Sequence, residues 1–307
     1  MPIKIPNELP ATKILTDENI FVMTETRAMT QDIRPLQILL LNLMPTKIDT
    51  ETQFSRLLGN TPLQVELTLI HTESHKSKNI SDDHLLSFYR VFNDIKEKYF
   101  DGMIITGAPV EHLDFEEVEY WDELCKIMEW SKTHVYSTFH ICWGAQAALY
   151  YHYKVNKIKL DTKLFGVFKH KAEYKKAILL RGFDDVFYIP HSRHTTVSRN
   201  EIENIPGMKI LASSTEAGVV LMMTENGRQI FITGHPEYDQ YTLDKEYRRD
   251  LMAGKPITCP KNYYPHDDIA NPPLVSWRAH ANLLYSNWLN YFVYQSTPYE
   301  IDKISDD

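Results

Sequence analysis

Short apolar runs of strand length alternate with segments of helical period along most of this 307-residue chain. Residues 35–43 predict a buried strand, a helix follows and ends at Leu58 before Gly59, and residues 63–70 predict the next strand. Two parallel strands joined by a helix form a βαβ unit, which is typical of sheets covered on both faces. The sequence therefore predicts an α/β fold with a mostly parallel sheet flanked by helices.

The same alternation continues towards the C-terminus. Residues 101–106 and 135–141 predict two further strands around a helix over 121–133, which makes a second βαβ unit. The other expected elements are a helix from Ser81 to about Phe100, a hairpin of strands 219–223 and 229–233 around an Asn-Gly turn, a helix over about 242–253, and an aromatic-rich helix over 276–294.

No Gly/Ser-rich or Pro-rich linker divides the middle of the chain, which favours one domain over two. The weak periodicity before residue 35 predicts an N-terminal arm over 1–34 that packs on the domain. We expect the catalytic α/β domain over 35–297 and a polar tail over 298–307.

Composition narrows the partners and the compartment. The chain carries 33 basic and 41 acidic side chains, a net charge of −8, which argues against a general role on nucleic acid or anionic lipid. Its three cysteines are an odd number without C-x-x-C spacing, so a reducing compartment fits better than a disulfide scaffold. The start lacks the apolar segment of a signal peptide, and no apolar run reaches membrane-spanning length, so we expect a cytoplasmic protein without a membrane partner.

Glycine positions exclude two common phosphate-binding loops. None of the 11 glycines forms a G-x-G pair, so the dinucleotide fingerprint and the P-loop are absent. A nucleotide-containing ligand must be held by other means. His191 and His194 lack the i, i+4 spacing of a helical metal site and no carboxylate cluster accompanies them, so we predict no metal.

Cys142 lies between an apolar strand and a helix, the arrangement of a nucleophile elbow. Such a turn exposes the side chain at the carboxyl end of a strand, where open α/β sheets bind ligands. The positive end of the following helix also favours the nucleophilic thiolate. The alternative is a buried structural cysteine, which remains our interpretation for Cys125 and Cys259.

A thiol nucleophile needs a base and a group that orients the base. Gly234-His-Pro-Glu237 offers both on a short turn after a strand, and Pro236 stiffens the turn. We predict that His235 takes the thiol proton and that Glu237 holds the imidazole, as in the Ser-His-Asp arrangement.

Backbone N–H groups near these residues predict an oxyanion hole. Trp143 follows the nucleophile, and Gly107 and Ala108 form another turn at the end of a strand. Pro109 has no N–H and cannot donate.

Several motifs together resemble a known family, the homoserine O-acyltransferases of the MetA type, which share the class I glutamine amidotransferase-like (flavodoxin-like) fold. The elbow reads His140-Ile-Cys-Trp-Gly-Ala-Gln146, where amidotransferases have Gly in place of His140. The other segments that carry the resemblance are 34–45, 182–185, 190–193, 234–239, 276–278 and 287–290.

The resemblance implies a ping-pong reaction in which an acyl-CoA acylates Cys142 and the hydroxyl of L-homoserine then takes the acyl group, for methionine synthesis. It assigns His235 as the base and Glu237 as its partner. It also implies substrate contacts at Lys163, Ser192 and Arg249, with Arg249 binding the amino-acid carboxylate as a bidentate fork. Acyl-CoA is then a co-substrate and no cofactor is needed; a homodimer is also implied.

Glu111 bears on the acyl group. Members of the family that use succinyl-CoA have Gly after Gly-Ala-Pro-x, whereas this chain has Gly107-Ala-Pro-Val-Glu111. Like charges at about 4 Å cost roughly 4 kcal/mol at an effective dielectric of about 20, so Glu111 is expected to repel a succinyl carboxylate. We therefore predict acetyl-CoA as the donor, with succinyl-CoA as the alternative.

Eight lysines lie between Lys154 and Lys176 against two acidic residues. Their excess is expected either to meet the CoA phosphates or to be the solvated face of a hairpin. The sequence leaves two other functions open. One is a glutaminase that releases ammonia, and the other is a non-catalytic binding or redox-sensing module in which Cys142 reacts with oxidants but transfers no acyl group.

Overall fold

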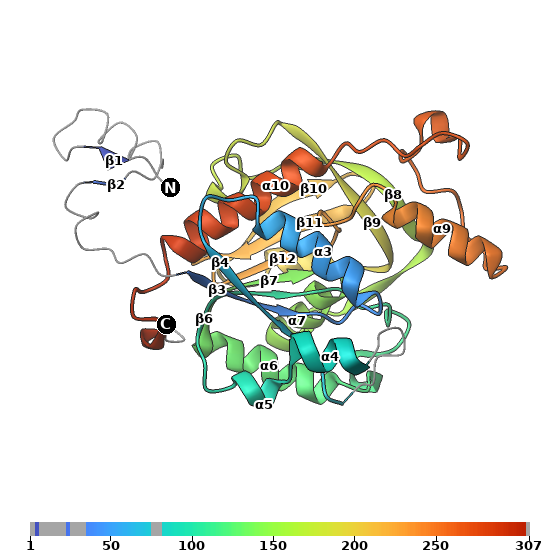
Figure 1. Cartoon of the computed structure of the whole chain (residues 1–307). Coiled ribbons are helices and arrows are strands. Elements are labelled where there is room, and N and C mark those ends of the chain that lie inside the picture. The colour runs from blue at the N-terminus through green and yellow to red at the C-terminus, as the bar shows by residue number, and fades with distance from the viewer. Residues whose placement is uncertain (1–3, 6–22, 25–34, 75–81, 305–307) are drawn as a thin grey trace.

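The computed structural model of the chain describes residues 4–5, 23–24, 35–74 and 82–304. A ten-stranded sheet crosses the molecule, with helices on both of its faces (Figure 1). In the order in which they lie across the sheet, its strands are β5 (Tyr89–Arg90), β4 (Val65–Ile70), β3 (Leu36–Leu41), β6 (Phe100–Ile105), β7 (Val135–Ile141), β12 (Gln229–Ile232), β11 (Gly218–Thr224), β10 (Met208–Ser214), β8 (Lys157–Ala172) and β9 (Val186–Val197). From β5 to β12 neighbouring strands are parallel, and from β12 to β9 they are antiparallel. The predicted mostly parallel α/β sheet is confirmed.

Helices cover the two faces unequally. On one face lie α3 (Lys47–Leu58), α10 (Arg278–Asn287) and the π-helix η4 (Trp288–Tyr294). On the other lie α4 (Asp82–Phe88), α5 (Phe92–Ile95), α6 (Trp121–His134) and α7 (Trp143–Tyr153). The remaining elements are α8 (Arg199–Glu203), α9 (Thr242–Met252), the 3-10 turns η1 (Phe115–Glu117), η2 (Ile178–Leu180), η3 (Pro265–Asp267) and η5 (Ile301–Lys303), and the parallel pair β1 (Lys4–Ile5) and β2 (Met23–Thr24).

Side-chain alternation along the strands divides the core into two layers. Ile38 and Leu40 of β3 pack with Phe54 of α3, whereas Leu39 and Leu41 face the α6 and α7 side. All four leucine and isoleucine side chains are fully buried. A strand buried on both faces reads as a continuous apolar run, which is why 35–43 was recognisable in the sequence.

The helix expected from Ser81 to about Phe100 is wrong: the described part is divided into α4, β5 and α5. Tyr89 interrupts it because its side chain is buried, where its hydroxyl donates to Glu51 and accepts a hydrogen bond from Asn42 Nδ2 at 2.8 Å. Tyr89 and Arg90 instead form the edge strand β5, which pairs with the end of β4. Ser81 itself lies outside the described residues.

The aromatic-rich helix over 276–294 begins two residues late and continues from α10 into η4. Trp288 stands at the change of pitch, fully buried, with its indole N–H donating to Ser137 Oγ at 3.0 Å. Together with the buried Tyr285 and Leu289, it makes this helix part of the chain's own core.

The N-terminal arm predicted over 1–34 lies outside the described residues apart from β1 and β2. Of the predicted tail, residues 298–304 are described and contain η5, with Ile304 buried. The boundaries at 34 and 297 stay predictions.

Candidate active site

Cys142 sits at the junction of β7 and α7 with φ 49° and ψ −114°, a backbone conformation that residues other than glycine rarely adopt. Two backbone hydrogen bonds hold it there: its N–H donates to Ile232 O at 2.7 Å, and its carbonyl accepts from Gln146 N at 3.1 Å. The first bond ties the elbow to β12, and the second starts the helix. The structure thus forms the nucleophile elbow that the sequence predicts.

Two glycines permit the close packing of this junction. A Cβ on Gly144 would lie 2.5 Å from the carbonyl oxygen of Thr106, so only glycine lets α7 start against the end of β6. A Cβ on Gly107 would lie 3.3 Å from Cys142 Cβ and 3.4 Å from His235 Cε1. Gly107 therefore lies directly against both residues of the predicted catalytic pair.

His235 and Glu237 follow β12 and reach the same junction. The imidazole Nδ1 lies 2.6 Å from Glu237 Oε1, and Cys142 lies near enough for its charge to act on the imidazole. The ring is stacked on Tyr238 with centroids 4.2 Å apart, and the backbone N–H of His235 donates to Pro190 O at 2.8 Å. Stacking and hydrogen bonds together fix the orientation of the imidazole.

Electrostatics at His235 favour an ion pair with the thiolate. Burial alone would lower the pKa of His235, but the negative charges of Cys142 and Glu237 outweigh burial and raise that pKa well above 6.5. A protonated imidazole beside a thiolate is the reactive state of a cysteine nucleophile.

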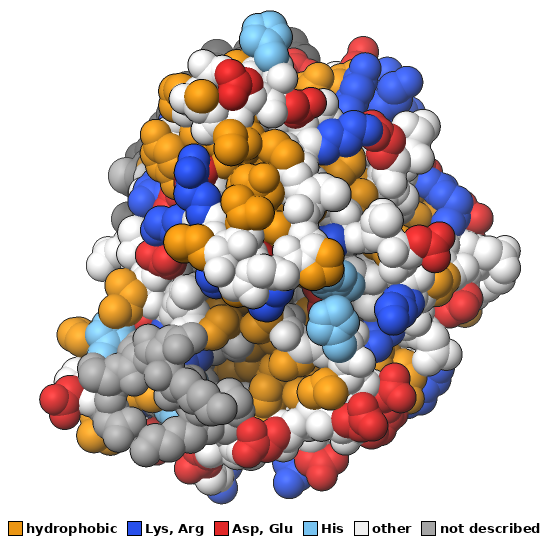
Figure 2. All heavy atoms as spheres, turned by 90° about the vertical axis from the view of Figure 1, so that its right-hand side faces the viewer, with side chains coloured by type: hydrophobic (Ala, Val, Ile, Leu, Met, Phe, Trp, Pro, Cys, Tyr) orange, Lys and Arg blue, Asp and Glu red, His pale blue; other side chains and the backbone are white. Residues whose placement is uncertain are grey.

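A cavity of about 320 Å³ opens over Cys142 and His235. It lies on the face drawn in Figure 2, where a hollow is rimmed by histidine and by lysine or arginine side chains. The four side chains to which the sequence assigned substrate or acyl recognition all line this cavity: Glu111, Lys163, Ser192 and Arg249. Residues from six separate parts of the chain thus meet at one end of the parallel strands.

Glu246 on α9 connects three of these residues and was missed by the sequence reasoning. Its Oε1 accepts hydrogen bonds from Lys163 Nζ at 2.6 Å and from Ser192 Oγ at 2.9 Å, and lies 3.9 Å from Arg249 Nη2. Glu246 and Arg249 are three residues apart on a helix, so they share one face. That spacing is the signal by which the sequence could have revealed it.

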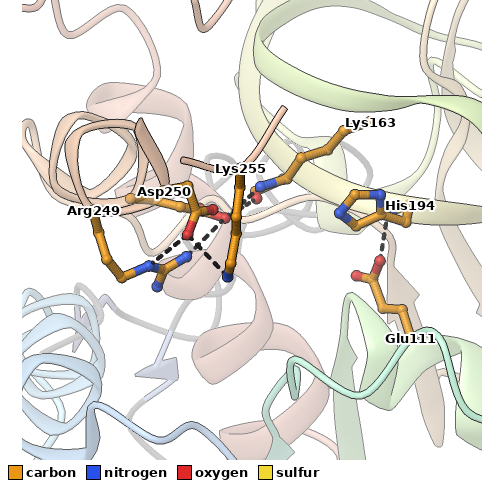
Figure 3. A network of polar contacts seen from close by, with 8 residues as sticks. Glu111, Lys163, His194, Arg249, Asp250 and Lys255 are labelled. Carbon is orange, nitrogen blue, oxygen red and sulfur yellow. Dashed lines mark hydrogen bonds and ion pairs between the residues drawn. The ribbon is translucent and has the colours of Figure 1, made fainter. Parts of the chain in front are cut away.

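Figure 3 shows how the charged side chains of the cavity converge. Arg249 Nε donates to Asp250 Oδ1 at 2.9 Å, and Lys255 Nζ lies 3.4 Å from the same oxygen. The Arg249 side chain is nevertheless 64% exposed, so its terminal nitrogens remain accessible from the cavity.

Glu111 lies in the turn after β6 with 9% of its surface exposed. Its carboxylate accepts a hydrogen bond from the backbone N–H of His194, the contact drawn in Figure 3. Burial raises the pKa of Glu111, and the hydrogen bond from His194 and nearby cations only partly oppose this rise. The side chain therefore occupies a fixed place in the cavity wall.

Arg193 is a second residue that the sequence reasoning missed. It is 1% exposed, and its guanidinium donates to His191 Nδ1, Thr195 O and Ala217 O. Within the described part of the chain, no carboxylate lies within ion-pair distance of it. Burial lowers the pKa of Arg193, while the charges of Cys142 and Glu111 act to raise it. A buried cation thus lies near enough to Cys142 and Glu111 to interact with their charges, without an ion-pair partner among the described residues.

The lysines between Lys154 and Lys176 are scattered along the long β8–β9 hairpin. Lys163 lines the cavity, and Lys157 and Lys159 line a neighbouring one of about 470 Å³ beside Glu111. Lys157 Nζ donates to the backbone carbonyls of Glu111 and Leu113. Lys175 is paired with Asp185 at the far end of the hairpin.

Neither a metal cluster nor a membrane span stands out in what the structure describes. No three His, Cys, Asp or Glu side chains of those residues are grouped as metal ligands. His191 instead faces His170, with the two Nε2 atoms 3.2 Å apart, and His194 lies beside His112. In residues 4–5, 23–24, 35–74 and 82–304 no helix combines the length and apolar content needed to cross a bilayer.

Comparison with solved structures supports the fold. A glutamine amidotransferase from Thermotoga maritima superposes with a TM-score of 0.56 at 11% identity, covering 83% of this chain and 97% of that one. A glutamine amidotransferase from Methylobacillus flagellatus gives 0.51 at 12% identity, covering 84% and 95%. At these identities the likeness concerns the fold alone, and it confirms the predicted amidotransferase-like architecture.

Comparison with sequences is closer. A protein of Acetivibrio thermocellus named homoserine O-acetyltransferase is 60% identical over 304 residues, covering 99% of this chain and 100% of the relative. One of the same name from Clostridium novyi is 62% identical over 300 residues, covering 98% and 99%. The family model described as homoserine O-succinyltransferase matches residues 2–299. The chain therefore belongs to the homoserine O-succinyltransferase family, whose relatives at about 60% identity carry the acetyltransferase name.

Proposed function

We propose that the chain transfers an acetyl group from acetyl-CoA to the hydroxyl of L-homoserine, giving O-acetyl-L-homoserine and CoA for methionine biosynthesis. The observation that carries this proposal is that Cys142 and His235 line one cavity, with the His235 imidazole hydrogen-bonded to Glu237. Full-length relatives named homoserine O-acetyltransferase support the choice of substrates.

In the first half-reaction, His235 takes the proton of the Cys142 thiol and the thiolate attacks the thioester carbonyl of acetyl-CoA. The C–S bond to CoA then breaks, His235 returns the proton to the departing sulfur, and the acetyl group stays on Cys142. In the second half-reaction His235 takes the hydroxyl proton of homoserine, whose oxygen attacks the acyl-enzyme and releases Cys142. Glu237 keeps the imidazole oriented and stabilises its charged form.

The oxyanion of each tetrahedral intermediate needs donors close to Cys142. Trp143 is the first residue of α7, so its N–H has no acceptor within the helix. Gly107 and Ala108 form the turn that packs against Cys142. We assign the hole to these backbone groups, each worth about 3 to 4 kcal/mol in comparable enzymes.

The cavity wall complements an amino acid at both of its charged groups. Arg249 presents a guanidinium for the carboxylate, and Glu246 presents a carboxylate for the ammonium group. Ser192 and Lys163, both held by Glu246, lie on the same wall as further donors. We assign the homoserine subsite to these four side chains.

Glu111 is assigned to the acyl end of the cavity. The side chain of Glu111 leaves space for a small, neutral acetyl group. Its negative charge repels a donor whose acyl group carries a carboxylate, such as succinyl-CoA. Transfer from succinyl-CoA is the second candidate, because the matching family model carries the succinyltransferase description.

A reducing compartment keeps a nucleophilic thiol functional, so we place the enzyme in the cytoplasm. The homodimer implied by the family resemblance is likewise a proposal. The small-molecule substrates are L-homoserine and acetyl-CoA.

Thiol release followed by colorimetry tests the function. The protein is mixed with acetyl-CoA or succinyl-CoA, with and without L-homoserine, and Cys142→Ala serves as control. We expect homoserine-dependent CoA release from acetyl-CoA that the control lacks. Ammonia from glutamine would support a glutaminase instead, and the absence of both products would support a binding or redox-sensing module.

A further inference from the structure

A second hollow of about 730 Å³ adjoins the catalytic cavity. The two share Met44, Thr46, Tyr238, Glu246 and Arg249, so one continues into the other. The second hollow runs along α3 from its first turn to Arg56 in its last turn, with the start of α9 as the opposite wall. Ten residues of helix between Thr46 and Arg56 correspond to roughly 15 Å, far longer than homoserine.

A hydrogen bond joins the two helices that form the walls of this groove. Gln53 of α3 donates to Thr242 Oγ1 at 3.1 Å, which fixes α3 against the start of α9. Arg278 enters from the start of α10, which lies beside α3 in Figure 1 and packs against it. The groove is therefore a built feature of three packed helices.

Cations outnumber carboxylates along the groove. Arg56, Lys245, Arg249 and Arg278 line it against three carboxylates, Asp49, Asp239 and Glu246. Arg56 is paired with Asp239, and Lys245 lies 3.7 Å from Asp49, both as exposed pairs that contribute little stability. Arg278 has no ion-pair partner among the described residues. Such weak pairs can be replaced by contacts with a phosphate, which guanidinium groups bind in a bidentate geometry.

The catalytic cavity continues into two hollows, and the geometry of the reaction indicates which of them holds the pantetheine arm of CoA. His235 serves as proton carrier for both the CoA sulfur and the homoserine oxygen, so the two atoms must occupy the same place beside it. The wall formed by Ser192, Glu246 and Arg249, to which we assign homoserine, is therefore also next to the chain attached to the CoA sulfur. That wall leads into the groove along α3.

The alternative opening lies beside Glu111, on the acyl side. It is lined by Lys157 and Lys159 but also by Glu111, Asp114 and Glu116, so carboxylates exceed lysines there. A polyphosphate would be repelled at that opening, and the acyl group itself points to it.

We propose that the groove between α3 and α9 binds the CoA moiety, with the pantetheine arm along α3 and the phosphates at Lys245, Arg56 and Arg278. This inference rests on the proposed function and adds the place of the donor's nucleotide. The chemistry recognised is a phosphorylated adenosine diphosphate on a flexible amide chain.

Steady-state kinetics with two donors test it: acetyl-CoA, and S-acetyl-N-acetylcysteamine, which has the thioester but no phosphates. We expect Arg278→Ala and Lys245→Ala each to raise KM for acetyl-CoA about tenfold, as for a lost charge-assisted hydrogen bond. KM for the short donor and for homoserine should stay within about twofold of wild type. Arg278→Lys should restore much of the loss, and Lys209→Ala, an exposed lysine on β10, should have no effect.

Equal losses with both donors would overturn the proposal, as would a rise in KM for acetyl-CoA in Lys159→Ala that Arg278→Ala does not show. Calorimetric binding of CoA to the wild type and to Arg278→Ala separates this inference from the proposed function. CoA binding that depends on Arg278 without any acetyl transfer would contradict the function and leave the groove assignment standing.

Discussion

The imidazole Nδ1 of His235 and the carboxylate Oε1 of Glu237 lie 2.6 Å apart although only Pro236 separates them in the chain. Both side chains are buried, so water does not compete for this contact. One short turn therefore holds both the imidazole and the carboxylate that orients it.

Replacing Glu237 by Gln should lower kcat by about a thousandfold with little change in KM, because an amide neither fixes the required tautomer nor stabilises the imidazolium. Loss of the carboxylate charge also lowers the pKa of His235. The measurement is homoserine-dependent CoA release, with mass spectrometry of acetylated Cys142 to follow the first half-reaction. A variant within tenfold of wild type would argue against this role for Glu237.

Replacing Glu111 by Gly should shift donor preference towards succinyl-CoA. Removing the carboxylate empties space and ends a repulsion of roughly 4 kcal/mol, so the succinyl-to-acetyl ratio of kcat/KM should rise by up to about a thousandfold. Glu111→Gln keeps the size without the charge and should give a smaller rise if space matters as well. Competition between the two donors measures the ratio; an unchanged preference in the Gly variant would refute the role assigned to Glu111.

Arg193 should support the reactivity of Cys142 through its buried positive charge. Arg193→Met should slow alkylation of Cys142 by iodoacetamide at pH 7 by about tenfold or more, whereas Arg193→Lys should lie nearer to wild type. The other two cysteines interfere little, because burial raises the pKa of Cys125 to about 11 and that of Cys259 above its ordinary value. Urea unfolding of each variant separates a local charge effect from loss of structure, and equal alkylation rates in folded variants would contradict the prediction.

Acid should destabilise the fold through histidines that are buried in neutral form. Burial lowers the pKa of His140 to about 3 and that of His170 to about 4, against 6.5 in the unfolded chain. Below pH 6.5 the two histidines therefore bind protons in the unfolded chain, whereas in the folded chain they stay neutral down to about pH 4. Above pH 6.5 neither histidine contributes to the pH dependence.

Between pH 6 and pH 4.5 each histidine should remove up to about 1.4 kcal/mol of unfolding free energy per pH unit. Urea midpoints measured across this range should fall steeply for wild type. His140→Gln and His170→Gln should each flatten the slope, and the double variant should flatten it further. A double variant with the wild-type slope would show that other groups control acid stability.

Sequence reasoning located the parallel half of the fold well because its signals are local. The strand over 135–141 was predicted with the bounds of β7. The strand over 35–43 was recognisable because a strand buried on both faces is a near-continuous apolar run. Cys142 and His235 were brought together by one argument, that parallel strands end at the same edge of a sheet. The geometry of the site agrees with that argument.

The antiparallel half was less visible. The first half of β8 alternates polar and apolar residues, but none of its side chains is buried, and its lysines suggested a solvated hairpin instead of part of the main sheet. Tyr89 broke a predicted helix through a buried hydroxyl contact with residues far away in the sequence. The role of Arg193 depends on its burial and on its hydrogen bond to Ala217 O, 24 residues away, which no local pattern records. Contacts between residues far apart in the sequence arise only when the elements pack together, so local sequence patterns do not reveal them.

The strained backbone at Cys142 has a cost for the stability of the whole molecule. A left-handed conformation at a residue with a side chain is unfavourable by about 1 to 3 kcal/mol, and it persists here because three strands and a helix meet around it. Glycine would adopt the same turn without strain, so an inactive protein with glycine at 142 would be the more stable one. Selection for activity thus maintains a less stable fold than the sequence could otherwise reach.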